Sequence, residues 1–121
     1  MKLKVVSVND NEEHSSERVF INVLEATDLT YYILRDTTYT EDNHISNKWQ
    51  HVYKFHKQIV NAGDQVVLYT KTGKDDVRTF ANGKKQYIYY WGLDSSVWNN
   101  TGDGAVLYEI RGWETFKVKP L

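Results

Sequence analysis

The residues of this chain best suited to bind a metal ion or to act as a general base are its four histidines, His14, His44, His51 and His56. His51 and His56 are five residues apart, a separation that places them on opposite faces of a regular strand. Neither has an acidic residue close by in the sequence that would orient its ring. We therefore expect surface or half-buried histidines and no metal site. Only His44, close to Glu41 and Asp42, is suited to an adventitious ion.

Other catalytic patterns are incomplete or absent. A phosphate-binding loop needs Ser or Thr after Gly83 and Lys84, where the chain has Lys85, and a glycine where it has Arg78. The Gly-x-Ser-x-Gly pattern of a hydrolase nucleophile does not occur, and the acidic pairs fit solvated turns. The chain has no cysteine, which excludes thiol catalysis, disulfides and cysteine-based metal sites. We expect a protein that is not an enzyme and that uses no metal or cofactor, with a histidine-based enzyme as the least favoured alternative.

A second chemical feature is a group of basic residues between positions 70 and 85. Its five basic residues, less Asp75 and Asp76, leave a surplus of three positive charges. Aromatic residues lie nearby in the sequence, and such a mixture suits contacts with the phosphates and bases of a nucleic acid. Polyanion or nucleic-acid binding through loop 71–85 is therefore one alternative function. The group consists of Lys71, Lys74, Arg78, Lys84 and Lys85.

A third feature is the number of aromatic residues, which exceeds what one face of a small core needs. The chain has nine Tyr, four Trp and four Phe. Those in segment 87–91, together with Trp113, are candidates for an open patch that stacks on a sugar or anchors a protein partner. Carbohydrate binding through exposed Tyr and Trp is the other alternative function. The candidate binding surface combines both groups: Lys71, Lys74, Arg78, Lys84, Lys85, Tyr87, Tyr89 and Trp91.

The elements that must position these residues have a period of two. Residues 18–24, for example, place Val19, Ile21 and Val23 on one face of a strand. Similar patterns predict strands at 3–8, 18–24, 30–39, 49–55, 65–71, 87–91, 105–110 and 113–118, with 3–8 and 87–91 at sheet edges. Turn signals separate them, and no window predicts a helix. This is typical of an all-β, immunoglobulin-like two-sheet sandwich of about eight short, mostly antiparallel strands, forming a single domain over residues 1–121.

Composition is consistent with such a domain and sets limits on its partners. Hydrophobic residues make up 40% of the chain, which is enough for an independent core. The net charge of -1 supplies no global field that would attract nucleic acid or an anionic membrane. No apolar segment is long enough for membrane insertion, and the first residues are too short for a signal peptide. If Met1 is the native start, we expect a cytoplasmic protein.

Several motifs occur in an order that resembles the lamin-tail domain family. The most specific is Val97-Trp98-Asn99-Asn100, followed by Gly102-Asp103 and by the apolar-Leu-Tyr run at 105–108. Upstream, segments 17–22, 29–36 and 59–69 are similar to three earlier strands of that family. Tyr32 stands where a Trp is usual, and Ala62 replaces a common Pro. The resemblance covers roughly residues 15–112 and implies an immunoglobulin-like sandwich that serves as an accessory binding module.

The residues of the last motif have a structural interpretation. The side chains of Asn and Asp bond to their own backbone in tight turns, glycine permits a positive φ, and a Trp can close the end of a core. We therefore expect a structural role for Trp98, Asn99, Asn100, Gly102 and Asp103. The resemblance implies docking to a macromolecule, with protein as the favoured partner and nucleic acid or carbohydrate as alternatives. Loops 41–48 and 73–86 are then the places to look for ligand binding.

Overall fold

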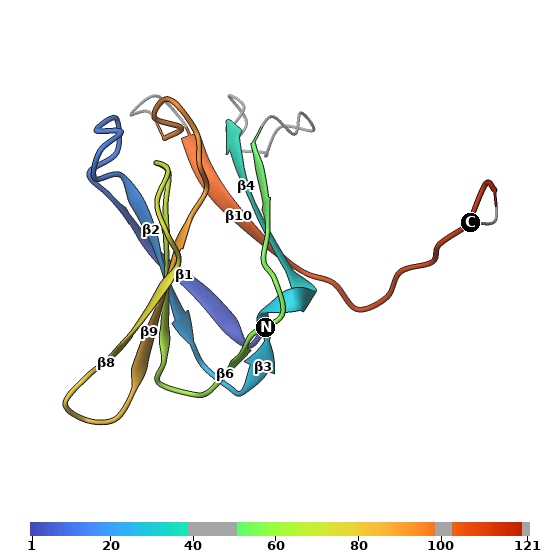
Figure 1. The fold of residues 1–121 in the computed structure, drawn as a ribbon, viewed down its shortest axis with the longest axis horizontal. Helices are drawn as coiled ribbons and strands as arrows, with labels where there is room; N and C mark the ends of the chain where they lie inside the picture. The colour runs from blue at the N-terminus through green and yellow to red at the C-terminus, as the bar shows by residue number, and fades with distance from the viewer. Residues whose placement is uncertain (39–50, 99–102, 120–121) are drawn as a thin grey trace.

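The computed structural model describes residues 1–38, 51–98 and 103–119, and these form ten β-strands and one short 3-10 helix. The strands make a two-layer sandwich of a five-stranded and a three-stranded sheet, with a small two-stranded ribbon at one end (Figure 1). The prediction of an all-β sandwich is confirmed. The described residues contain two more strands than the eight that the sequence indicates, because several strands are only two to four residues long.

The first sheet has the order β1-β2-β7-β9-β8. Its strands are β1 (Leu3–Asn9), β2 (Arg18–Val23), β7 (Gln65–Tyr69), β9 (Lys85–Tyr90) and β8 (Asp76–Thr79). The pair β7–β9 is parallel and the other pairs are antiparallel. The chain leaves β7, forms β8 at the edge and returns as β9 between the two. Strand β1 lies at an edge as predicted, whereas the prediction that segment 87–91 forms an edge is wrong.

The second sheet has the order β10-β4-β5, and both of its pairs are antiparallel. Its strands are β4 (Tyr32–Thr38), β5 (Val52–Lys54) and β10 (Asp103–Glu109). The ribbon pairs β3 (Thr27–Asp28) with β6 (Ile59–Val60), and the 3-10 helix η1 (Leu29–Tyr31) leads from it into β4. Asp28 caps this helix, since its carboxylate accepts a hydrogen bond from Thr30 N at 3.0 Å.

The core lies between the two sheets and follows the alternation of the strands. Val19, Ile21 and Val23 of β2 point inward and are almost fully buried, as the sequence predicts. From the other layer, Leu34 and Phe55 pack into the same cluster. Trp98 is only 3% exposed and belongs to this core as well.

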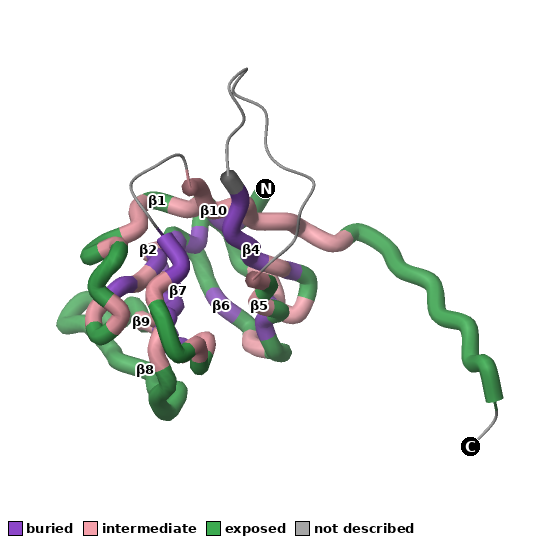
Figure 2. Tube along the Cα trace, turned by 90° about the horizontal axis from the view of Figure 1, so that it is seen from above, coloured by how far each residue is buried: buried purple, intermediate pink, exposed green. Residues whose placement is uncertain are grey.

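One turn and one predicted strand need separate comment. Strands β8 and β9 form a hairpin in which Phe80 N donates to Lys84 O and Gly83 N donates to Phe80 O. Gly83 has a φ of +83°, a value that suits glycine. The predicted strand at 113–118 is wrong, because residues 110–119 form no strand. Segment 110–119 runs outward from the body, and most of it is exposed (Figures 1 and 2).

Helices contribute little to the fold. The described part of the chain contains no helix that is both long and apolar enough to cross a membrane.

Candidate binding face

The face of the five-stranded sheet that points away from the core carries three rows of side chains. In the first row, Arg18 lies beside Tyr69, and Tyr69 lies beside Tyr90. The second row contains Phe20, Val67, Ile88 and Asp76, and the third contains Asn22, Gln65, Gln86 and Arg78. The rows exist because every second residue of a strand faces the same side of a sheet. Residues of four strands, β2, β7, β9 and β8, thus meet on one surface.

This surface has a hollow of about 350 Å³. Val67 and Ile88 form its inner part, and both are nearly buried although neither belongs to the core between the sheets. Longer polar and aromatic side chains form the rim. The hollow is lined by Arg18, Phe20, Val67, Tyr69, Lys74, Asp76, Arg78, Gln86, Ile88 and Tyr90.

The aromatic rings at the rim are stacked on one another and on cations. The rings of Tyr69 and Tyr90 are nearly parallel, with centroids 5.2 Å apart and an interplanar angle of 15°. The guanidinium of Arg18 lies 5.9 Å from the Tyr69 centroid, and Lys71 Nζ lies 5.4 Å from it. A Cβ built on Gly73 would lie only 2.4 Å from the Tyr90 ring. These contacts hold the rings in place and occupy much of their surface.

Positive charge prevails among the residues that line the hollow. They include three basic residues, Arg18, Lys74 and Arg78, and one acidic residue, Asp76. Arg18 is held in position by Asp10 at 2.9 Å and by Ser16 O at 2.8 Å. Within the described part of the chain, neither Lys74 nor Arg78 makes an ion pair. The hollow therefore offers cationic groups to a ligand.

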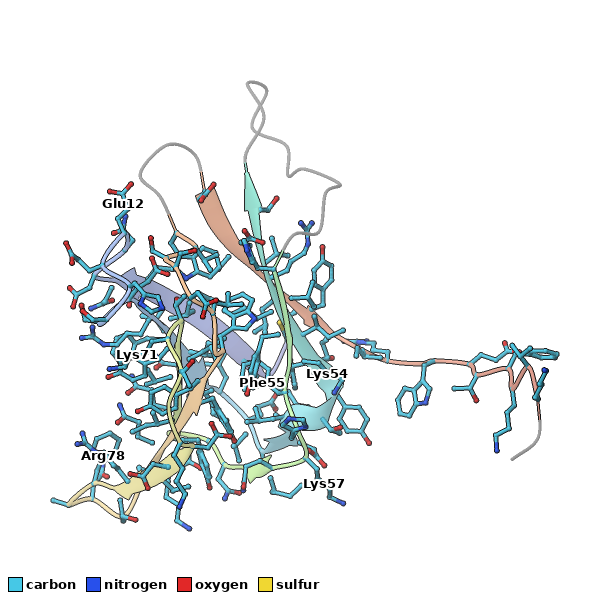
Figure 3. All side chains as sticks on the ribbon, turned by 45° about the horizontal axis from the view of Figure 1, so that its top comes forward. Glu12, Lys54, Phe55, Lys57, Lys71 and Arg78 are labelled. Atoms are coloured by element: carbon cyan, nitrogen blue, oxygen red, sulfur yellow. The ribbon has the colours of Figure 1, made fainter. Side chains whose placement is uncertain are left out.

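The structure separates the predicted basic group into two parts. Lys74 and Arg78 line the hollow, and Lys71 lies beside it over Tyr69. Lys84 and Lys85 lie apart from it at the hairpin turn, where Lys84 Nζ donates to Ala62 O at 3.0 Å. Figure 3 shows Lys71 and Arg78 on the side of the five-stranded sheet, with Lys57 on the other side of the molecule.

The structure separates the residues of the predicted aromatic patch: Trp113 is 70% exposed and Tyr90 lines the hollow, but the others lie wholly or partly inside. Tyr87 and Tyr89 point inward and are 5% and 9% exposed, so the prediction that they lie on an open surface is wrong. Trp91 is half-buried and packs against Trp98, with ring centroids 6.2 Å apart. The rings that do lie on the outer face are their neighbours in the alternation, Tyr90 of β9 and Tyr69 of β7. Strand β9 has aromatic residues on both of its faces. Its sequence therefore does not show which of these residues point into the core.

Arg18 and Phe20 line the hollow but were not predicted as binding residues, whereas Tyr69 was among the aromatic residues expected near the basic group. A signal for Arg18 and Phe20 was present, because the alternation of 18–24 places them on the face opposite Val19 and Ile21. Comparing the outward residues of all strands would have shown several large side chains on the solvent side. Their proximity to Lys74 and Arg78 could not be inferred without the strand order β2-β7-β9-β8.

A histidine and a carboxylate meet at the end of the sandwich that holds Trp91. His51 Nδ1 lies 2.9 Å from Asp36 Oδ2, and His51 N donates to Asp36 Oδ1 at 3.0 Å. The sequence analysis found no carboxylate to orient His51, because Asp36 is 15 residues away and reaches it by the pairing of β4 with β5. This hydrogen bond fixes the orientation of the ring. Among the described residues, no group of three or more His, Asp or Glu side chains is suited to hold a metal ion.

His14 and His56, the other two histidines that the structure describes, do not join this pair. His14 Nε2 lies 2.6 Å from Leu93 O, a contact that ties the β1–β2 connection to the segment after β9. His56 is exposed. His44 and the whole of loop 41–48 lie outside the described residues.

The motif at 97–103 is tied to the interior by a buried carboxylate. Val97 N and Trp98 N donate to the two carboxylate oxygens of Glu17, which is fully buried. This arrangement agrees with the structural role expected for Trp98. Asp103 is the first residue of β10. Asn99, Asn100 and Gly102 lie outside the described residues.

Comparison with known proteins identifies no relative: no protein-family model, curated protein or solved structure matches this chain. The resemblance to the lamin-tail domain family therefore stays a prediction.

Proposed function

We propose that the protein is a non-enzymatic binding module that holds an anionic polymer on the outer face of its five-stranded sheet. The observation that carries this proposal is the convergence of Lys74, Arg78 and Arg18 around one open hollow. Basic residues that are scattered over a surface contribute mainly to solubility. Basic residues that surround one hollow can neutralise neighbouring anionic groups of a single ligand.

The contacts of the aromatic rings favour an anionic ligand over a neutral sugar. A sugar-binding platform needs a ring face that is open to solvent. Here Tyr69 has Tyr90, Arg18 and Lys71 close to its ring, and Gly73 lies against Tyr90. The cations remain as the groups that a ligand can reach. The Gln86 amide, from the third row of side chains, also lines the hollow. Its Nε2 donates to Gln65 Oε1 at 2.7 Å.

The lamin-tail resemblance supports the non-enzymatic part of the proposal, because that family supplies accessory binding modules. The basic residues that line the hollow support an anionic ligand. A partner protein with a strongly acidic segment is a second candidate. The carboxylates of such a segment would bind the same basic residues as the anionic groups of a polymer.

Heparin is a suitable probe, since it is a linear polyanion whose binding to cations is sensitive to salt. We expect immobilised heparin to retain the protein, and Lys74→Ala and Arg78→Ala to elute at clearly lower salt. Each substitution should also reduce the slope of log affinity against log salt by about 1. Lys57→Ala is the matched control, because Lys57 is an exposed cation away from this face. A protein that is not retained at low salt, or equal losses in Lys57→Ala, would contradict the proposal.

A further inference from the structure

The edge of the hollow along strand β8 carries an acidic residue between two basic ones. Asp76 and Arg78 are two residues apart in this strand, and Lys74 precedes Asp76 by two residues. All three side chains line the hollow. Residues two apart in an extended chain are separated by about 7 Å, so the charges follow one another as positive, negative, positive. A ligand that contacts both cations must therefore also pass Asp76.

We propose that the anionic polymer bound in this hollow is an acidic polysaccharide with free hydroxyl groups between its anionic groups. Such a ligand is a narrower class within the proposed function, on which this inference rests. The anionic groups of the polysaccharide bind Lys74 and Arg78. A hydroxyl group between them donates a hydrogen bond to the carboxylate of Asp76.

The hollow contains acceptors that need donors from the ligand. A carboxylate accepts hydrogen bonds and repels anions. Asp76 Oδ1 accepts the Val77 N–H at 2.8 Å, and the Asp76 side chain is exposed to a ligand. The Gln86 amide donates through Nε2 to Gln65 Oε1, so its oxygen is the atom that it offers as an acceptor. Sugar hydroxyls donate to such acceptors, whereas the phosphodiester backbone of DNA has no donor.

The spacing of the charges disfavours DNA as the ligand. Each strand of a DNA duplex carries a phosphate about every 3.4 Å along the axis. A strand that reaches from Lys74 to Arg78 would therefore also set phosphates against Asp76. Unpaired bases find no open stacking platform here, because the rings of Tyr69 and Tyr90 are stacked on each other.

The inner part of the hollow suits a sugar ring. Val67 and Ile88 form an apolar floor, and Phe20 lies at the rim. The C–H groups of a sugar ring can pack on this floor while its hydroxyls reach the polar groups at the rim. The volume of about 350 Å³ lies within the range of roughly 300–1,000 Å³ of pockets that enclose small ligands. The hollow is therefore large enough to enclose a sugar unit of the polymer.

Competition against immobilised heparin tests the class of polymer. Chondroitin sulfate has free hydroxyls between its anionic groups, whereas poly(vinyl sulfate) and duplex DNA have denser charge without such hydroxyls. Counterion release alone favours the two denser polymers. We expect the opposite order, with concentrations counted as anionic groups at fixed salt. Chondroitin sulfate should release half of the bound protein at a concentration about tenfold lower than either competitor.

Two kinds of failure can be told apart in this experiment. Equal or stronger release by poly(vinyl sulfate) or DNA overturns the choice of an acidic polysaccharide, and stronger release by DNA assigns the hollow to nucleic acid. In both cases retention on heparin, and with it the proposed function, still stands. A protein that heparin does not retain at all contradicts the proposed function itself.

Asp76→Asn tests the role of the acidic residue. It keeps an oxygen that can accept the Val77 N–H and removes the negative charge. We expect DNA binding to gain several-fold more than chondroitin sulfate binding, so that the preference for chondroitin sulfate becomes smaller. Asp75→Asn is the matched control, because it removes the same charge from an exposed neighbour that does not line the hollow. An unchanged preference in Asp76→Asn, or an equal change in Asp75→Asn, overturns the proposal.

Discussion

Glu17 shows how one buried side chain can hold several segments of this chain together. Its carboxylate accepts hydrogen bonds from Glu12 N, Thr70 Oγ1, Val97 N and Trp98 N, at 2.6 to 3.3 Å. The donors come from the β1–β2 connection, the end of β7 and the segment that leads to β10. A buried carboxylate is stable only when it is satisfied by such donors. The single carboxylate of Glu17 therefore links three segments of the chain to one another.

Replacing Glu17 tests this role. Glu17→Ala leaves the buried N–H groups of Val97 and Trp98 without an acceptor, and each unsatisfied group costs roughly 1–3 kcal/mol. We expect the free energy of unfolding to fall by about 3 kcal/mol or more, as measured by urea denaturation. Glu13→Ala, an exposed glutamate in the same connection, should change it by less than about 0.5 kcal/mol. Equal effects of the two substitutions would show that Glu17 has no special role.

The half-buried hydroxyl of Tyr53 makes the folded state less stable as the pH rises into the alkaline range. Burial, with a smaller contribution from Asp75, raises the pKa of Tyr53 from 10.0 to about 12. Because the folded state holds the proton more tightly, this stability is fully present below pH 10 and is lost as the pH rises towards 12. The pKa of Tyr89 is shifted in the same direction, chiefly by burial. Urea denaturation at a series of alkaline pH values should show a smaller loss for Tyr53→Phe than for the wild type. An identical loss would rule out this role of Tyr53.

Single residues also show where sequence analysis stopped. The packing of Trp98 could be predicted, since a large aromatic residue in a turn next to a strand needs a place in the core. The partners of Glu17 and His51 could not. Asp36 reaches His51 across a strand pair, and Val97 N donates to Glu17 from 80 residues away. Such contacts depend on tertiary structure and leave no local pattern.

Strands could be predicted well where one of their faces is buried. Strands β1, β2, β4, β7 and β10 have long alternating or apolar segments, and the sequence located each of them to within a few residues. The short strands β3, β6 and β8 were missed, because segments of two to four residues carry too little of a period. The segment at 113–118 has the alternation of a strand, but it pairs with no strand of the part of the chain that the structure describes. Alternating side chains indicate that a segment can form a strand, but a strand forms only where another strand pairs with it.

The close approach of Gly73 to Tyr90 gives a prediction for the binding face. Any Cβ at position 73 would meet the Tyr90 ring at 2.4 Å, so Gly73→Ala must displace that ring. We expect a loss of about 1–3 kcal/mol in the free energy of unfolding and weaker retention on heparin. Gly112→Ala is the control, because a Cβ at position 112 would meet nothing within 4 Å. An unchanged heparin profile for Gly73→Ala would mean that the position of Tyr90 does not matter for binding.

At the scale of the whole molecule, the architecture could be predicted and the location of the binding face could not. The recurrence of short strands and turns indicated a two-sheet sandwich, and that prediction is confirmed. The insertion of β9 between β7 and β8 could not be inferred. Parallel strands such as β7 and β9 are not joined by a hairpin turn, so no local sequence signal marks the pair. This insertion is what places Tyr90 beside Tyr69 and Arg78 beside Gln86. The candidate hollow is therefore a product of strand order.

The pairing of β4 with β10 has a consequence for the order in which the protein folds. The hairpins β1–β2 and β8–β9 join neighbouring segments and can close early. In contrast, Tyr32 Oη donates to Glu109 across 77 residues, and Arg35 Nε donates to Tyr108 Oη across 73. Closing so long a loop costs entropy before any contact repays it. During synthesis β4 can pair with β5 first, but the second layer of the sandwich is complete only after the ribosome has released the chain as far as Glu109.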